Sequence, residues 1–337
     1  MAAQKTARAR RIVVTGVGAN PGFGLTRSLQ RLGHQLICTD AEPLVPGLLL
    51  PDTIGRVSPR ADHPAYAAHM IRVCRETRAD AIVVGIENDL IPLLAAQRTL
   101  AQNGVRMWLP TAASVQTCLD KAAFHKALTN HGIPTPRSVL PHQIHELGSV
   151  ADELVVKPRR GHGAQDVYFC STAEQARVLC ELVPDALVQE RIRGAEFTAD
   201  CLVDRAGRAS VILRRRDLVK GGLSAVATTF DDARVEARVR QTLTAVGAAG
   251  LCCVQGFITS TGPEPVVITE LNVRVAGGFA LAEAAGADLV GQMVNGLFHR
   301  PVDHDRLTYQ PGIFLTHYTE TLTSGDQSLL PRAEETP

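Results

Sequence analysis

The 337-residue chain is longer than one small domain, and we expect two or three compact units. Hydrophobic residues make up 45% and charged residues 20% of it, the range of an ordinary globular protein. The formal net charge of +1 excludes a global field that would draw the chain to nucleic acid or to an anionic membrane. We therefore expect no nucleic-acid or membrane partner and look for function in local sites.

The cysteines and the apolar runs bear on the cellular compartment. None of the 8 cysteines has C-x-x-C spacing and most lie within apolar runs, so we expect reduced thiols in a cytoplasmic protein. The basic segment 1–11 is followed by no apolar stretch of the secretory kind. No apolar run approaches the roughly 18 residues of a membrane helix.

The first 112 residues alternate apolar strands with helices. Strands are expected at residues 11–17, 35–40 and 80–86, and helices at residues 25–34 and 65–78. This alternation predicts a parallel, doubly wound α/β sheet.

A glycine-rich turn, residues 16–24, follows the first strand and opens a helix. Its N–H groups could hold an anion. The dinucleotide fingerprint, however, has glycine where Pro21 stands, so a nicotinamide site with Asp40 on the ribose is the weaker interpretation. A tight strand-to-helix turn is the simpler one, and a loop beside a substrate pocket is a third.

From residue 154 onward, short strands have polar or glycine-rich connections. Only two substantial helices interrupt them, at residues 172–182 and 234–248, which indicates an α+β architecture. A last helical stretch is expected at residues 279–297. The polar tail from about residue 320 is expected to be poorly ordered.

Two lysines and a glycine turn occur in an order that suits a nucleoside triphosphate. Lys121 opens a helix, and Lys157 lies on a short strand before the glycine-containing turn 159–166. Lysine provides a compact cation for phosphate oxygens. Successive backbone N–H groups in such a turn can enclose a phosphate.

A later strand carries Glu270 and Asn272, with Arg274 two residues further on, so that all three are expected on one face. Carboxylate and amide oxygens suit Mg²⁺, and an arginine can stabilise charge on a transferred phosphoryl group. Taken singly, Lys157 would be a strand-edge lysine and Glu270 a surface carboxylate. Their order and spacing together favour the functional interpretation.

From residue 110 to about 297 this order resembles the ATP-grasp superfamily, and most closely its branch of carbamoyl-phosphate-synthase-like domains and carboxylate–amine ligases. The resemblance implies a Rossmann-like pre-ATP-grasp domain at 1–112, a linker and lid at 113–187, a C-terminal catalytic domain with an antiparallel sheet at 188–320, and a disordered tail at 321–337. It also implies ATP and a pair of Mg²⁺ ions as cofactors.

The resemblance assigns roles to individual residues. Those implied to bind ATP are Lys121, Lys157, His162, Gly163, Ala164, Gln189, Glu190, Ile192 and Glu196. Within this set, the lysines contact phosphates, residues 162–164 form the mobile phosphate loop, residues 190–192 form the adenine hinge, and Glu196 binds ribose. The implied metal ligands are Gln255, Glu270 and Asn272. The catalytic candidates are Arg274, Lys157 and Arg216.

Two positions depart from the family pattern. The first metal ligand is often an acid, whereas Gln255 stands here, as in the carbamoyl-phosphate-synthase branch. His162 occupies the phosphate loop where small residues are common, and it either has no special role or tunes lid closure.

An arginine run and a glycine turn are the substrate-side candidates. Arginine pairs with both oxygens of a carboxylate. Arg214 and Arg216 share a face of an alternating strand, so we expect at least one arginine of this run toward the site and one toward solvent, the alternative being a solvated basic edge strand. The candidates for substrate contact are Arg214, Arg216, Gly221, Gly222, Ser224, Asn20, Glu87 and Gly277.

The activity implied by the resemblance is an ATP-dependent carboxylate–amine ligase. It would make an amide or peptide bond through an acyl phosphate, with an amino acid as substrate, and release ADP and phosphate. Because an acyl phosphate hydrolyses in water, residues 124–187 are expected to act as a lid. The alternatives are carboxyphosphate or carbamoyl-phosphate chemistry, an NAD-dependent oxidoreductase and a non-catalytic nucleotide-binding module. The expected partners are a small carboxylate and an amine, and a homodimer stays open.

Overall fold

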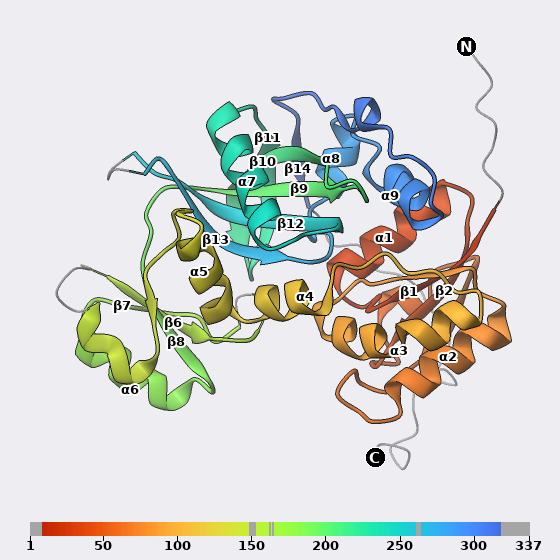
Figure 1. The fold of residues 1–337 in the computed structure, drawn as a ribbon, viewed down its shortest axis with the longest axis horizontal. Coiled ribbons are helices and arrows are strands. Elements are labelled where there is room, and N and C mark those ends of the chain that lie inside the picture. Colours follow the sequence, from red (N-terminus) through yellow and green to blue (C-terminus); the bar gives the residue numbers. More distant parts are fainter. Residues whose placement is uncertain (1–8, 148–152, 162, 164, 261–263, 318–337) are drawn as a thin grey trace. The chain divides into compact units, whose positions relative to one another are not determined.

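The computed structural model describes residues 9–147, 153–161, 163, 165–260 and 264–317 (Figure 1). The chain divides into two compact units. The first contains the described residues up to Trp108 together with Val290–Pro301, and the second contains Leu109–Leu289 and the described residues from 302 onward.

The first unit is built on a four-stranded sheet in the order β3-β2-β1-β4, in which every pair is parallel. The strands are β1 (Arg11–Thr15), β2 (Gln35–Asp40), β3 (Thr53–Val57) and β4 (Ala81–Val83). The helices are α1 (Asn20–Arg31), α2 (Tyr66–Thr77) and α3 (Leu90–Gln102). Figure 1 shows α1 on one face of the sheet and α2 and α3 on the other, which confirms the predicted doubly wound α/β domain.

Buried apolar residues of β1 explain why this sheet forms. Ile12, Val13 and Val14 have no exposed surface, as the predicted apolar run requires. The strand expected at residues 80–86 ends earlier, at Val83. Gly85 follows it in a close backbone contact, because a Cβ there would lie 2.2 Å from the carbonyl oxygen of Thr15.

Strand β3 and helix α3 were not expected from the sequence patterns. In β3, Ile54 is 44% exposed and Val57 is 52% exposed, so this edge strand lacks the buried apolar run that marks β1. This edge strand is held in the sheet by its pairing with β2, and no hydrophobic pattern marks it in the sequence.

The segment Val290–Pro301 belongs to the first unit, although it lies within the range expected for the C-terminal domain. It contacts residues of that unit directly: the guanidinium of Arg10 lies 4.5 Å from the ring centroid of Phe298. Gly296 lies against the ring of Trp108, with only 1.9 Å between that ring and the position of a Cβ. The first compact unit is therefore built from two stretches that lie far apart in the sequence.

The second unit contains two antiparallel sheets and the helices beside them. The small sheet has the order β5-β8-β6-β7, and the larger one has the order β13-β12-β9-β10-β11-β14. The strands are β5 (Ser138–Val139), β6 (Leu154–Pro158), β7 (Tyr168–Cys170), β8 (Ala186–Glu190), β9 (Ala195–Val203), β10 (Ala209–Lys220), β11 (Leu223–Thr229), β12 (Gly250–Ile258), β13 (Val266–Asn272) and β14 (Phe314–Thr316). The helices are α4 (Ala112–Leu119), α5 (Lys121–Asn130), α6 (Ala173–Leu182), α7 (Ala233–Ala245) and α8 (Ala280–Ala284). The predicted α+β architecture is confirmed.

The small sheet has its own core, which includes Ile144, Leu154, Val156 and Val188, with Ala176 of α6 packed among them. The boundary expected at residues 187/188 falls inside β8, whose Leu187 and Val188 both pair with β6. The small sheet therefore continues to the end of β8.

The helical stretch expected at residues 279–297 is two helices, α8 and α9 (Leu289–Leu297). Gly286 separates them with φ +110°, a conformation outside the helical region. The tail expected to be disordered lies outside the described residues. Within the described ranges, no helix has the length and apolar character needed to cross a bilayer.

Candidate active site

Three charged residues predicted from the sequence come together in the second unit. Lys121, at the start of α5, places its Nζ 3.1 Å from Oε1 of Glu270 on β13. Lys157, on β6, interacts electrostatically with both Lys121 and Glu270. Residues separated by more than a hundred positions in the sequence therefore form one cluster.

The environment of Lys157 alters its acidity. Its Nζ donates to Oε1 of Gln189 at 2.8 Å. Burial lowers the pKa of Lys157 to about 8, with Lys121 adding to the effect and Glu270 opposing it. Such a lysine is a poorly solvated cation, which a phosphate group would stabilise.

Glu270 stays ionised in this cluster. Burial by itself would raise the pKa of Glu270, but the charges of Lys121, Lys157 and Arg274 outweigh it and lower that pKa. Arg274 follows β13 and donates from Nη2 to Oδ1 of Asn272 at 3.4 Å, so it lies at the end of the strand as expected.

The predicted metal ligands lie on two paired strands. Gln255 of β12 and Glu270 of β13 are register partners, so their side chains share a face, and Asn272 continues that face. One carboxylate and two amides supply the hard oxygen atoms that Mg²⁺ prefers. Within the described ranges no group of three or more histidine, cysteine or acidic side chains could hold a metal, so the candidate site depends on amide oxygens beside its one carboxylate. The donor set fits Mg²⁺ whose other ligands come from phosphate oxygens.

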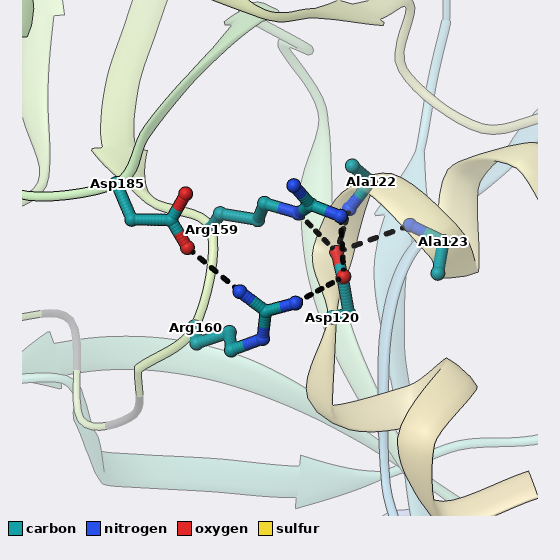
Figure 2. A network of polar contacts seen from close by, with 6 residues as sticks. All are labelled: Asp120, Ala122, Ala123, Arg159, Arg160 and Asp185. Atoms are coloured by element: carbon teal, nitrogen blue, oxygen red, sulfur yellow. Dashed lines mark hydrogen bonds and ion pairs between the residues drawn. The ribbon is translucent and has the colours of Figure 1, made fainter.

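The start of the predicted phosphate loop is held by ion pairs (Figure 2). Asp120 accepts hydrogen bonds from the guanidinium groups of Arg159 and Arg160. Lys121 donates from Nζ to the carbonyl oxygen of Gly161 at 2.8 Å. Gly163 has φ +69°, whereas His162 and Ala164 lie outside the described residues.

The side chain of Glu190, at the expected adenine hinge, faces the small sheet. It accepts from the backbone N–H of Arg137 at 2.9 Å and from its Nε at 3.1 Å. The backbone N–H of Glu190 donates to the carbonyl oxygen of Arg137. Ile192 follows β8 and is partly buried in the segment that leads to β9.

The hairpin of β10 and β11 gathers several substrate candidates. Gly221 and Gly222 form its turn with φ +54° and +76°, values that favour glycine at both positions. Arg216 donates to the carbonyl oxygen of Gly222 at 2.6 Å and to Oγ of Ser224 at 3.0 Å. It also forms a short ion pair with Glu196, the residue expected to bind ribose. Arg216 therefore lies beside a predicted nucleotide residue.

Arg214 has a different environment from the one expected. Its side chain is 2% exposed and its Nε donates to Oδ2 of Asp200 at 2.7 Å. A Cβ on Gly278 would lie 2.9 Å from its Nη1, so the guanidinium also packs against the turn that contains Gly277. Strand β10 lies between β9 and β11, which excludes the alternative of a solvated edge strand.

In the first unit, the glycine turn packs on itself. Gly22 lies directly against Gly16: a Cβ on Gly22 would be 2.2 Å from the carbonyl oxygen of Gly16. Asp40 accepts from the N–H of Gly18 at 2.7 Å, so the acid proposed for a ribose closes the turn instead. This geometry favours the tight strand-to-helix turn over a nicotinamide site.

Two other candidates lie in the first unit. Asn20 is the first residue of α1. Glu87 begins a short 3-10 helix, Glu87–Asp89, after β4 and is buried.

Sequence reasoning missed the two acids that organise the arginines. The sequence patterns assigned no role to Asp120 or to Asp200. Asp120 carried a usable signal, because an aspartate directly before Lys121 is a typical N-cap, and the arginines follow the phosphate strand. Nothing local marks Asp200, whose partner is 14 residues away on the neighbouring strand.

Two family models match separate ranges of the chain. Residues 118–278 match the family model of the ATP-grasp domain, and residues 12–108 match that of the PylC-like N-terminal domain. The carbamoyl phosphate synthase large chain of Methanothrix thermoacetophila is 24% identical over 289 residues, which are 78% of this chain and 26% of that protein. The chain thus spans about a quarter of the length of this curated relative.

Solved structures share the fold. The L-amino acid ligase of Bacillus licheniformis has a TM-score of 0.70 and 18% identity, with 90% of this chain and 78% of that chain covered. The biotin carboxylase of Campylobacter jejuni, in a complex with β-γ-ATP, has a TM-score of 0.69 and 13% identity, with 86% and 70% covered. At these identities the likeness concerns the fold, and it confirms the predicted architecture.

Proposed function

We propose, on the premise that this chain is a member of the ATP-grasp superfamily with a PylC-like N-terminal domain, that it is an ATP-dependent carboxylate–amine ligase. In this proposal it activates the carboxylate of an amino acid as an acyl phosphate and transfers the acyl group to an amine. The products are an amide or peptide, ADP and phosphate.

The observation that carries the proposal is the convergence of Lys121 and Lys157 on Glu270, with Arg274 beside it. Three cations around one carboxylate suit a triphosphate whose metal is bound by that carboxylate. Phosphoryl transfer needs charge neutralisation and positioning more than covalent help from the protein. This arrangement supports attack at the γ-phosphorus.

In the first step, an oxygen of the substrate carboxylate attacks the γ-phosphorus and the bond to the ADP oxygen breaks. Lys121 and Lys157 bind phosphate oxygens and offset the charge that moves to ADP. Arg274 stabilises the transferred phosphoryl group. In the second step, the amine attacks the acyl carbon, the bond to phosphate breaks, and the amine loses a proton.

Gln255, Glu270 and Asn272 would hold Mg²⁺, whose charge would further neutralise the phosphates. Glu196 would bind the ribose, and Arg216 beside it would orient Glu196 or meet the substrate carboxylate. The small sheet with α6 would act as the lid that excludes water from the acyl phosphate.

A second candidate is carboxyphosphate or carbamoyl-phosphate chemistry, in which bicarbonate takes the place of the amino acid. It is favoured by the curated relative, a carbamoyl phosphate synthase large chain, and by Gln255 at a metal position. Both reactions begin with attack of a carboxylate-type oxygen on the γ-phosphorus, so they share the residues named above.

The test is to incubate the protein with Mg·ATP and a panel of amino acids, with hydroxylamine in place of the amine. A hydroxamate that accumulates together with ADP is the expected result. AMP and pyrophosphate as products would overturn the roles of the lysines, because in an adenylating enzyme the carboxylate attacks the α-phosphorus of ATP and pyrophosphate leaves. ADP release with bicarbonate alone would favour the second candidate.

Nucleotide preference provides an independent check. Calorimetry should detect Mg²⁺-dependent binding of ATP in preference to NAD, because Asp40 is engaged by the N–H of Gly18. Tight NAD binding without ATP binding would refute the ligase proposal and favour an oxidoreductase.

A further inference from the structure

Asp120 is the centre of a polar network that joins two segments of the second unit (Figure 2). Its Oδ1 accepts from the N–H groups of Ala122 and Ala123 at 3.0 and 3.2 Å, and so caps α5. The same oxygen accepts from Nε of Arg159 at 2.7 Å, and Oδ2 accepts from Nη2 of that residue at 2.6 Å. Oδ2 also accepts from Nη2 of Arg160 at 2.8 Å.

The carboxylate is well suited to hold these groups. Asp120 is only 6% exposed, and bidentate pairing with a guanidinium fixes both distance and orientation. Burial alone would raise the pKa of Asp120, but the hydrogen bonds from Arg159 and from the N–H of Ala123, together with the charges of Arg159 and Arg160, lower it. The network therefore favours the ionised form of Asp120.

The segments that Asp120 joins are those that carry the two candidate phosphate-binding lysines. Lys121 follows it directly, and Arg159 lies two residues after Lys157. A second contact runs in parallel, since the N–H of Lys121 donates to the carbonyl oxygen of Arg159 at 3.1 Å. Nζ of Lys121 reaches the carbonyl oxygen of Gly161 at 2.8 Å. The end of β6 and the residues after it are thus tied to α5 by the carboxylate of Asp120 and by two hydrogen bonds of Lys121.

Charge gives a second reason for holding the arginines. Only Gly161 separates Arg159 and Arg160 from the predicted phosphate loop, and a guanidinium binds phosphate in a bidentate manner. Released from Asp120, two mobile cations would compete with Lys121 and Lys157 for the triphosphate. The network keeps both guanidinium groups directed at Asp120, with Arg160 also contacting Asp185 at 2.9 Å.

We infer that Asp120 is a positioning residue for phosphoryl transfer, acting through Arg159 to set Lys121 and Gly161 against Lys157. This rests on the proposed function, because it presupposes that ATP phosphates bind at these lysines. The alternative is a helix cap with no influence on nucleotide binding.

The decisive variant is Asp120→Asn. Its amide oxygen can still cap α5. Its amide nitrogen, in the place of Oδ2, would face the two guanidinium groups as a donor. The matched control is Asp232→Asn, because Asp232 caps α7 through the N–H groups of Arg234 and Val235 and also pairs with the Arg234 guanidinium.

Calorimetry with Mg·ATP, together with thermal melting, measures both roles. We expect Asp120→Asn to weaken Mg·ATP binding about tenfold or more and to raise KM for ATP, while the control binds as the wild type does. Arg159→Gln, which leaves the cap intact, should have a similar effect. The double variant should be no weaker than either single one, since both changes break the same link.

Several results would overturn the inference. Wild-type affinity and KM in Asp120→Asn would reduce Asp120 to a cap, and so would a lowered melting temperature with unchanged affinity. If Asp120→Asn does not fold, unchanged binding in Arg159→Gln would have the same meaning. A wild-type protein that binds no Mg·ATP would instead refute the proposed function itself.

Discussion

Replacing Glu270 with glutamine tests the centre of the candidate site. The substitution keeps the size of the side chain and removes one negative charge 3.1 Å from Nζ of Lys121. The side chain of Glu270 is 24% exposed and glutamine keeps its shape, so the variant should still fold. What it removes is the only carboxylate among the predicted metal ligands.

The expected effect on turnover is large. Loss of a pre-organised electrostatic group typically costs about 10²–10³ in kcat, or roughly 3–4 kcal/mol of transition-state stabilisation. Binding of ATP without Mg²⁺ should behave differently. Because Lys121, Lys157 and Arg274 lose the negative charge that they share, Glu270→Gln should bind metal-free ATP at least as tightly as the wild type.

The assay combines ADP release with calorimetry in the presence and absence of Mg²⁺. Glu264→Gln is the matched control, since Glu264 precedes the same strand, is exposed and pairs with Arg238. A Glu270→Gln protein that melts normally and retains wild-type turnover would show that Glu270 is a surface carboxylate. Weaker binding of metal-free ATP would refute the charge reasoning.

Three further predictions concern titration and packing. The pKa of Lys157 is lowered to about 8, and this lysine must be charged to bind phosphate. We therefore expect kcat/KM for ATP to fall as the pH rises through about 8. The variant Lys157→Arg should remove that fall from the pH profile. Gly22→Ala should reduce the free energy of unfolding by about 1–3 kcal/mol in urea titration, since the new Cβ would lie 2.2 Å from the carbonyl oxygen of Gly16; an unchanged midpoint would contradict this. Arg214→Met should lower the free energy of unfolding by about 3–5 kcal/mol, because it leaves the buried carboxylate of Asp200 without its cationic partner. Adding Asp200→Leu should restore much of that stability. Equal stability of the single and double variants would refute this explanation.

Local patterns in the sequence were sufficient for much of the fold. The buried run of β1 and the amphipathic spacing of α2 were visible because each depends on residues a few positions apart. The order of Lys121, Lys157 and Glu270 likewise predicted a triphosphate site, and the structure brings these three together. Strand β3 lacked such a signal, since an exposed edge strand buries too little apolar surface to show a period.

Only the tertiary structure decided which charges pair. Arg214 and Arg216 look equivalent in sequence, yet one is buried against Asp200 while the other joins Glu196 and the hairpin turn. The register of β9 with β10 makes that choice. It pairs Arg214 with Thr198 and Ile212 with Asp200, so Asp200 is the diagonal neighbour of Arg214 on the same face of the sheet. Asp120 likewise meets Arg159 across 39 positions. Such partners are selected by strand pairing and loop closure, which are properties of the folded chain and leave no periodic trace in the residues themselves.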